Sequence, residues 1–365
     1  MYTVRKLNCN ISLFPIESNY IVDSSVESVP SLIPRAEVEE EYLDKEILRI
    51  KMLSSVTNFT IVYLGAYYHP NIVTFHNRTL LVSRSHDGPF YERPLFYWLQ
   101  KINDSFYNIS AELKINNSGF LVGAEQLRQI YLPNGNIFYS FTTPIGKWWN
   151  TRMMQGEITY DDFTNTISAS SSPVFIERPE DNGEKQKNWT PFLYNKTVYY
   201  IHTIYPLTIV SSTGSFSPSG AIQAKTLSVD NCASISWEYG KPRGGTPAVL
   251  IDDEFYLSFF HSISSPASSY WMGAFTFTKS LPFRLLQISS VPIVHESWYK
   301  GIHFDSKFSF IPYPIGFEIE ESFSKEKNVL VSMSTQDKIG LIIKFSLNDL
   351  MNSLVHVKYK CELPI

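Results

Sequence analysis

Pairs of short apolar runs, each pair separated by a tight polar turn, recur along most of the chain. The runs are rich in Val, Ile, Tyr and Phe, and Gly, Pro, Asn or charged residues flank them, which is typical of β-hairpins. Five hairpins are predicted on this basis, at residues 69–88, 123–144, 187–206, 241–262 and 314–337. Each begins with polar, glycine or proline residues and ends on a polar residue.

The hairpins follow one another at intervals of about 55–70 residues, which leaves room for about four strands in each repeat. Such a repeat predicts an all-β fold, a five-bladed β-propeller with a short N-terminal extension. Two packed β-sandwiches are the alternative, since the spacing alone does not separate the two architectures. Apolar runs at 273–289 and 339–350 predict outer strands, and the spacing of Leu and Met predicts one short helix at 346–354.

No break in composition divides the 365 residues into several domains. We expect a lead-in at residues 1–56 that packs on the propeller, and a single propeller domain at residues 57–365. Segments 173–186 and 211–221 are rich in charged residues or in Ser, Gly and Pro, and they are predicted to be surface loops.

Aromatic residues are abundant, with 22 Tyr, 25 Phe and 7 Trp. Most are expected in the core, although ring faces also stack on sugars. The net charge of −4 and the lack of a basic block argue against nucleic-acid binding. No CxxC motif is present, so neither a metal site nor a cofactor is expected.

The cysteines, the N-terminal segment and the glycosylation triplets indicate the cellular compartment. Cys9, Cys232 and Cys361 are far apart and odd in number, so no disulfide framework is expected and a cytoplasmic location is predicted. The N-terminus lacks a continuous apolar signal segment, and no run approaches the length of a membrane span. Without a secretory signal, Asn-x-Ser/Thr triplets are interpreted as chance matches. These triplets begin at Asn10, Asn58, Asn77, Asn108, Asn188 and Asn195, among other positions.

The polar ends of the hairpins predict one shared pocket, because the first strand of every propeller blade borders a central channel. The starts of the first strands supply His69, Asn71, Glu125, Gln126, Arg128, Lys187, Asn188, Trp189, Arg243, Gly244, Gly245, Thr246, Tyr313, Pro314 and Gly316. The ends of the second strands supply Arg84, His202, His261 and Asp337. Cations, amides and an indole ring in one pocket suit a sugar joined to phosphate or diphosphate.

Individual residues in this set have both a functional and a structural interpretation. Arg243 offers a planar fork for an anion, and Gly244 lets backbone N–H groups approach a ligand closely. Arg84 and Arg128, however, could simply pair with acids of a neighbouring blade. His202 and His261 could be hydrogen-bonded structural histidines, and Trp189 could be blade packing. The acidic pairs at 161–162 and 252–253 are interpreted as turns rather than metal sites.

Several short motifs occur in a characteristic order: KNWTPF at 187–192, RGGTPAV at 243–249, and PIGFEIE at 314–320 followed by LVSMSTQD at 330–337. In these motifs the chain resembles the five-bladed propellers of the family 130 glycoside phosphorylases and hydrolases. It is similar also to related glycosyltransferase-like proteins, among them β-1,2-mannosyltransferases, which carry KNWxPF and RGGx motifs. The resemblance covers residues 57–350.

The chain departs from this family at one position. The resemblance implies Glu-Asp-Pro-Arg at the start of the second blade, with the Asp acting as proton donor or acceptor. Here the run is Glu125-Gln126-Leu127-Arg128, and the Gln126 amide does not transfer protons at ordinary pH. Three consequences stay open: Glu125 or Asp337 takes over this catalytic role, the chemistry differs, or activity is lost.

The predicted function is transfer of a glycosyl unit by a glycosyltransferase or glycoside phosphorylase. The resemblance implies that this unit is mannosyl. The partners expected are a sugar or oligosaccharide acceptor and a sugar phosphate or nucleotide-sugar donor. A centre rich in cations and poor in acids favours phosphate chemistry, because hydrolysis with inversion needs a second carboxylate. Two alternatives stay open: a sugar-binding propeller without catalysis, suggested by Gln126, and a glycoside hydrolase.

Overall fold

A computed structural model describes the strand core of the chain. The described residues are 10–12, 59–65, 68–75, 78–84, 94–103, 106–116, 124–145, 147–170, 172–181, 185–264, 269–295, 298, 311–322, 325–335 and 339–361. The lead-in expected at residues 1–56 lies outside this set except for β1 (Asn10–Ser12), which pairs in parallel with β2 (Phe59–Gly65).

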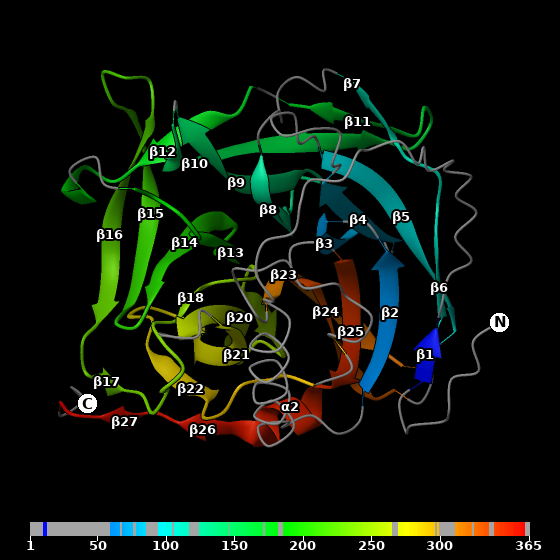
Figure 1. Ribbon diagram of the computed structural model, residues 1–365. Helices are drawn as coiled ribbons and strands as arrows, with labels where there is room; N and C mark the ends of the chain where they lie inside the picture. Colours follow the sequence, from blue (N-terminus) through cyan, green and yellow to red (C-terminus); the bar gives the residue numbers. More distant parts are fainter. Residues whose placement is uncertain are drawn as a thin grey trace, which may run out of the picture.

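The described chain is built mostly of strands, in five antiparallel runs (Figure 1). The first run is β3 (Tyr68–Phe75), β4 (Arg78–Arg84), β5 (Pro94–Asn103) and β6 (Phe106–Ile109). The second is β8 (Glu125–Tyr131), β9 (Ile137–Ile145), β10 (Lys147–Asp161) and β11 (Thr166–Ala169). The third is β13 (Thr190–Tyr194), β14 (Thr197–Ile204), β15 (Leu207–Phe216) and β16 (Ile222–Asp230).

The last two runs complete the set. The fourth contains β18 (Arg243–Gly244) and β19 (Val249–Ile251), which both pair with β20 (Phe255–Ser264), then β21 (Ser269–Thr278) and β22 (Leu285–Ser289). The fifth is β23 (Pro312–Glu321), β24 (Lys327–Thr335), β25 (Ile339–Ser346) and β2. The pairs β3–β4, β8–β9, β13–β14, β19–β20 and β23–β24 form the hairpins that the sequence predicts, so all five predicted hairpins are confirmed.

The fifth run joins the two ends of the described core. Strand β2 pairs antiparallel with β25, and Phe59 lies opposite Phe345. The inner strands also contact their neighbours from run to run: β23 contacts β3, β3 contacts β8, β8 contacts β13, β14 contacts β18, and β20 contacts β23. In Figure 1 these strands lie toward the middle of the molecule and the later strands of each run lie toward its edge.

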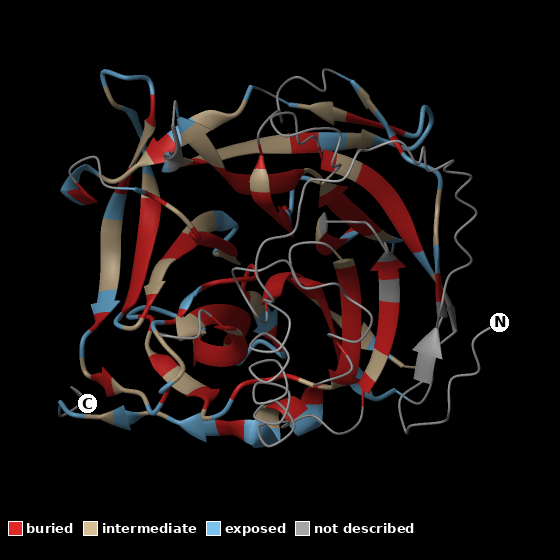
Figure 2. Cartoon of the chain, in the orientation of Figure 1, coloured by how far each residue is buried: buried red, intermediate tan, exposed pale blue. Residues whose placement is uncertain are grey.

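Middle strands of the runs are buried on both faces (Figure 2). In β24, Val329, Leu330 and Val331 are all nearly inaccessible, although successive side chains point to opposite faces of a strand. A strand packed on both sides needs a continuous apolar sequence rather than an alternating one. This explains the unbroken apolar runs in the sequence.

Shorter elements connect the runs. Strand β12 (Val174–Glu177) pairs with β10 and β16 and so links the second and third runs, and β7 (Lys114–Asn116) pairs with β11. The expectation of loops at 173–186 and 211–221 is therefore wrong in part, since β12 and the end of β15 occupy them. Both strands are too short or too polar to show a periodic pattern.

The predicted short helix is confirmed as α2 (Leu347–Ser353). Its N-cap is Ser346, whose hydroxyl accepts a hydrogen bond from the Asp349 N–H at 3.2 Å. Leu347 and Leu350 are its buried residues. The strand β26 (Leu354–His356) follows directly and pairs with β22. No helix in the described residues has the length and apolar character needed to cross a membrane.

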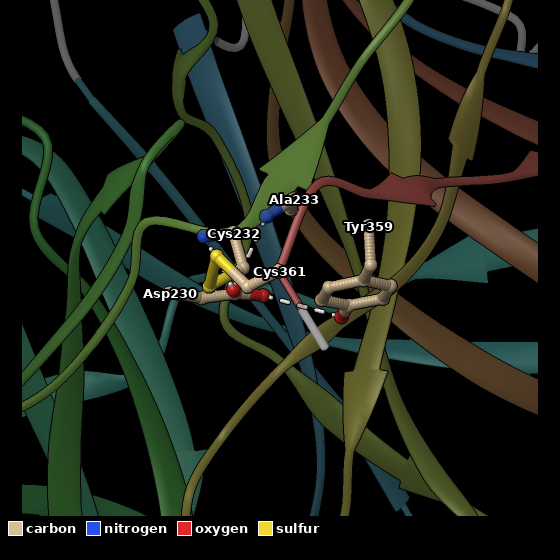
Figure 3. The surroundings of a disulfide bond; sticks show 5 residues. All are labelled: Asp230, Cys232, Ala233, Tyr359 and Cys361. Carbon is tan, nitrogen blue, oxygen red and sulfur yellow. Dashed lines mark hydrogen bonds between the residues drawn. A yellow bond between two sulfur atoms is a disulfide. The ribbon is translucent and has the colours of Figure 1, made fainter. Parts of the chain in front are cut away.

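The expectation that the cysteines form no disulfide is wrong, because Cys232 and Cys361 are bonded to each other (Figure 3). The bond ties the segment after β27 (Lys358–Tyr359) to the segment between β16 and β17 (Ala233–Ser234), and β17 pairs with β27. Asp230 supports the corner: its carboxylate accepts hydrogen bonds from the N–H groups of Cys232 and Ala233, both at 3.3 Å. The pairing spans 129 residues of sequence, so nothing local signals it.

Breaking this disulfide is expected to destabilise the fold. A cross-link between residues 129 positions apart restricts the unfolded chain by up to about 5 kcal/mol. Cys232→Ser should therefore lower the urea midpoint of unfolding, and adding a thiol reductant to the wild type should reproduce that shift. The matched control is Cys9→Ser, which leaves the bond intact. An unchanged midpoint in Cys232→Ser would contradict the stabilising role.

Candidate functional site

The first strands of several runs begin with an irregular backbone. His69, Gln126 and Asn188 have φ angles of 44°, 56° and 65°, in the left-handed region that side-chain-bearing residues rarely adopt. The pairing register shifts at two of these places, between Tyr68 and Asn71 and between Glu125 and Arg128. These are β-bulges, which redirect side chains at the ends of strands.

Arg128 is buried completely and holds the second run against the fourth. Its Nε donates to the Gly245 carbonyl at 2.6 Å and its Nη2 to the Gly244 carbonyl at 3.3 Å. A third bond, from Nη1, goes back to the Gln126 carbonyl at 3.1 Å. Desolvation lowers the pKa of Arg128, and the neighbouring Tyr313 opposes that shift. The partners of the buried guanidinium are therefore main-chain carbonyls rather than an acid of a neighbouring blade.

The paired glycines are required by packing between backbones. A Cβ on Gly244 would overlap the Asn188 carbonyl oxygen, and one on Gly245 would lie 2.6 Å from the Phe259 carbonyl oxygen. Thr246, next in the sequence, is fully buried, and its Oγ1 accepts from the Phe259 N–H at 3.0 Å. The glycines therefore let three strands meet closely, and Thr246 locks the junction.

Asn71 makes the corresponding connection for the first run. Its side chain is fully buried, and Nδ2 donates to the carbonyls of Leu127 at 2.8 Å and Ile315 at 3.3 Å. One amide thus contacts the starts of both β8 and β23. Its position after a bulge matches that of Arg128 in the next run.

Tyr313 is a meeting point for residues from other runs. Its hydroxyl donates to Asn188 Oδ1 at 2.9 Å, and its ring centroid lies 4.3 Å from that of His261 and 5.9 Å from that of His69. His69 Nδ1 in turn lies 2.6 Å from Arg84 Nη1. Tyr313 and its neighbours thus bring together residues of the first, third, fourth and fifth runs.

His261 is buried to 2 % exposure and lies between Tyr313 and Tyr270, whose ring is nearly parallel to it at 5.9 Å. Burial is the main cause that holds its pKa well below the usual value, and the charges of Arg128, Arg243 and Lys187 act in the same direction. His261 is therefore neutral at physiological pH. Its Nδ1 is buried with no hydrogen-bond partner among the described residues.

Glu125 and Lys187 form an ion pair at 3.8 Å across the second and third runs, and each side chain is about one-third exposed, at 30 % and 34 %. Arg243 is also exposed, and it lies opposite His261 in the pairing of β18 with β20. We call these residues the central cluster: Glu125, Lys187, Asn188, Arg243, His261 and Tyr313. The cluster brings together one carboxylate, the partly exposed Lys187 and the exposed Arg243.

Gln126 lies beside this cluster. It is only 6 % exposed, and its Oε1 has no hydrogen-bond partner among the described residues. Its main-chain carbonyl is the acceptor for Arg128, so the backbone at this position is held independently of the side chain.

Trp189 and His202 form a second group of contacts. Trp189 is 1 % exposed, donates to Gln186 Oε1 at 3.0 Å, and contacts the His202 ring edge-on at 5.1 Å. Its faces are covered by Tyr200 and other core residues, so packing accounts for the indole. His202 Nε2 lies 3.7 Å from the buried Asp181, which also bonds to Arg178.

Asp181 and Tyr270 are not among the site residues predicted from the sequence. Asp181 lies in a segment predicted to be a loop, and Tyr270 is one aromatic among many in a strand. Asp337, predicted as a catalytic residue, lies outside the described residues. No group of metal-ligating side chains is found within the described ranges.

No protein-family model matches the chain, and no curated protein matches it. Solved structures do. A β-1,2-mannobiose phosphorylase from Listeria innocua matches with a TM-score of 0.51 and 12 % identity, over 80 % of this chain and 92 % of that one. A glycosyl hydrolase from Bacteroides ovatus matches with a TM-score of 0.50 and 11 % identity, over 78 % and 85 %.

A third structure comes from work on the GH130 family of mannoside phosphorylases, which contains hydrolases that target β-1,2-mannosidic linkages in Candida mannan. It matches with a TM-score of 0.50 and 11 % identity, over 78 % of this chain and 85 % of that one. The fold is of the GH130 type. At these identities the likeness concerns the fold alone, and it confirms the resemblance that the sequence motifs indicated.

Two arginines of the predicted site should respond differently to substitution. Arg128→Met should lower the free energy of unfolding by about 3 kcal/mol, because it leaves buried carbonyls without donors. Arg243→Met should change it by less than about 0.5 kcal/mol, because its side chain is exposed. Urea unfolding followed by tryptophan fluorescence measures both. Equal losses in the two variants would contradict the assignment of Arg128 as the structural arginine.

His202 should make stability depend on pH. Desolvation, with Arg178 next in size, lowers its pKa to about 4 from the usual 6.5, despite the opposing charge of Asp181. As pH falls from about 6.5 to about 4, the unfolded chain takes up a proton that the folded chain does not, so the free energy of unfolding decreases. His202→Gln should flatten this dependence.

The exposed His356 supplies the control, since His356→Gln should keep the wild-type pH dependence. Denaturant melts between pH 4 and pH 7 make the comparison. If the two variants have parallel pH profiles, His202 is not the group responsible.

Proposed function

We propose that the chain is a carbohydrate-active enzyme that transfers a glycosyl unit to or from an anionic phosphate group at the central cluster. We further propose that residues 57–365 form one five-bladed β-propeller, with the five runs as blades and β2 completing the fifth. The GH130-type fold supports both parts. The mannosyl unit is proposed because two of the matched structures concern β-1,2-mannosides.

The observation that carries the proposal is the charge distribution of the central cluster. Glu125 is its carboxylate, and the partly exposed Lys187 and the exposed Arg243 are cations on neighbouring runs. The charged neighbours that shift the pKa of His261 are all cations. An anion bound here would gain charge-assisted hydrogen bonds from an Arg fork and a Lys ammonium.

The proposed reaction assigns a separate task to each exposed group. Arg243 and Lys187 hold the phosphate or diphosphate. One of its oxygens forms a bond to the anomeric carbon in phosphorolysis, and that bond breaks in the synthetic direction. In the synthetic direction the Glu125 carboxylate accepts the proton of the acceptor hydroxyl, whose oxygen attacks the anomeric carbon as the C–O bond to phosphate breaks. In phosphorolysis the protonated Glu125 returns that proton to the departing sugar oxygen.

Neutral His261 and Asn188 are proposed to position the substrate, and they do not transfer protons. Tyr313 fixes Asn188 through a 2.9 Å hydrogen bond and packs against the imidazole, so both side chains are held before a ligand binds. Asp337 remains a second candidate base on sequence grounds, and a sugar phosphate and a nucleotide sugar remain the two candidate donors. A hydrolase would require a second carboxylate facing Glu125.

A second candidate function is sugar binding without catalysis. Gln126 favours it, because a buried amide stands where the resemblance implies a proton-transferring Asp. This function differs from the first in a simple way: ligands would bind, but no bond would be made or broken.

The proposal is tested by incubating the protein with β-1,2-mannobiose and inorganic phosphate, and separately with mannose 1-phosphate or a mannose nucleotide and an acceptor mannoside. We expect sugar phosphate in the first reaction, or phosphate or nucleoside diphosphate in the second. Glu125→Gln should reduce the rate by about 10²–10⁴-fold, since it removes the general acid–base group. Arg243→Ala should mainly raise the KM for the anionic substrate.

The matched controls are Glu254→Gln and Lys225→Ala, which alter exposed charges elsewhere and should keep wild-type rates. Full activity in both Glu125→Gln and Arg243→Ala would overturn the assignment. Thermal stabilisation by these ligands without turnover would favour the binding function instead.

A further inference from the structure

The Asn-x-Ser/Thr triplets whose burial the structure describes fall into two structural classes. Burial is described throughout for three of them, which begin at Asn108, Asn188 and Asn195. Asn108 and Asn195 are exposed, whereas Asn188 is 6 % exposed and part of the central cluster. We propose that Asn195 and Asn108 carry N-linked glycans, in a chain that folds in an oxidising compartment of the secretory pathway.

The disulfide is the independent observation that changes the interpretation of these triplets. Disulfides form and persist in oxidising compartments and are rare in reducing ones. The Cys232–Cys361 bond fixes the end of the described chain beside β16, where Asp230 and Tyr359 form a hydrogen-bonded corner around it (Figure 3). One of these compartments, the lumen of the endoplasmic reticulum, is also where Asn-x-Ser/Thr triplets are glycosylated.

Asn195 occupies the tip of the β13–β14 hairpin. Asn195 and Lys196 have φ angles of 47° and 62°, as in a two-residue turn that projects from the sheet. Asn195, Lys196 and Thr197 are all exposed. A glycan on the Asn195 amide would extend into solvent without displacing any buried group.

Asn108 lies at the outer side of the first run. It belongs to β6, which ends the sheet order β3-β4-β5-β6, and it pairs with the exposed Gln100. Tyr107, its neighbour on the other face of the strand, is buried and bonds to Glu320 at 2.6 Å. The strand is therefore anchored by one face while Asn108 points away from the core.

Asn188 provides the contrast within the same chain. Its Oδ1 accepts the Tyr313 hydroxyl, and its main-chain carbonyl lies so close to Gly244 that no Cβ fits there. A glycan on this amide is incompatible with the folded structure. The folded protein must therefore carry no glycan at Asn188, even if the glycosylating enzyme can modify this triplet in the unfolded chain.

The proposed glycans also avoid the central cluster. Lys187 and Asn188 precede the first residue of β13, and Asn195 follows its last. Five residues of strand span about 16 Å, so the glycan and the cluster lie at opposite ends of β13. Modification at Asn195 therefore leaves the proposed sugar site open.

The modification joins the Asn Nδ2 to the anomeric carbon of an oligosaccharide carried on a lipid diphosphate. The bond between that carbon and the diphosphate oxygen breaks, the lipid diphosphate leaves, and the amide nitrogen loses one proton to a base. No oxidation or reduction takes place in this step.

Site occupancy tests the proposal directly. The full chain, recovered through an affinity tag from the cells that make it naturally, is fractionated to keep only folded protein. It is then treated with peptide N-glycosidase in heavy-oxygen water, which converts each glycosylated Asn to labelled Asp. Peptide mass spectrometry should find label at Asn195 and Asn108 and none at Asn188. Asn195→Gln and Asn108→Gln should each remove one step of gel mobility.

Each outcome decides a part of the proposal. Lack of label at Asn195 or at Asn108 overturns it for that residue, and label at Asn188 in folded protein overturns the structural distinction. Differential alkylation of the same sample should find Cys232 and Cys361 protected from reagent until a reductant is added. Free thiols at both positions in the folded protein would overturn the assignment of compartment.

Discussion

The arrangement of the inner strands depends on one buried cation. Arg128 is fully enclosed, and it donates three hydrogen bonds to main-chain carbonyls, two of them on the fourth run. A guanidinium that loses its water must recover those hydrogen bonds within the protein, because an unpaired buried charge is very costly. Its position therefore fixes how β8 meets β18, and Asn71 applies the same constraint between β3, β8 and β23.

This constraint explains why the candidate site is built from irregular backbone. The carbonyls that Arg128 and Asn71 need are those of residues at bulges or beside glycines, since regular strands use their carbonyls for pairing. Left-handed residues such as His69 and Gln126 cost of order 1–3 kcal/mol each. The buried hydrogen bonds offset that cost, and the result is a set of side chains held at the starts of the inner strands before any ligand is present.

Local sequence patterns were enough to predict much of the fold but only part of the candidate site. The five hairpins, the outer strands and the Ser346-capped helix were predictable because turns, caps and apolar runs are encoded within a few residues. The convergence of strand starts followed from the repeat. The roles of Arg128, Trp189 and Gly244, and the Cys232–Cys361 bond, depend on partners far away in sequence. A buried arginine that binds carbonyls has the same local sequence as one that binds phosphate, so no pattern separates them.

The two ends of the inner hairpins serve different purposes. At the turn ends, exposed ion pairs such as Lys279–Asp253 and Lys327–Asp252 join neighbouring turns, and backbone pairing is regular. At the start of β8, the Gln126 backbone is held by its own carbonyl and by Arg128, and not by the Gln126 side chain. Gln in place of the Asp that the resemblance implies there alters the chemistry available without removing any contact that the fold requires. Fold and activity can therefore diverge at this position, and a shared fold is a guide to the kind of ligand rather than proof of the reaction.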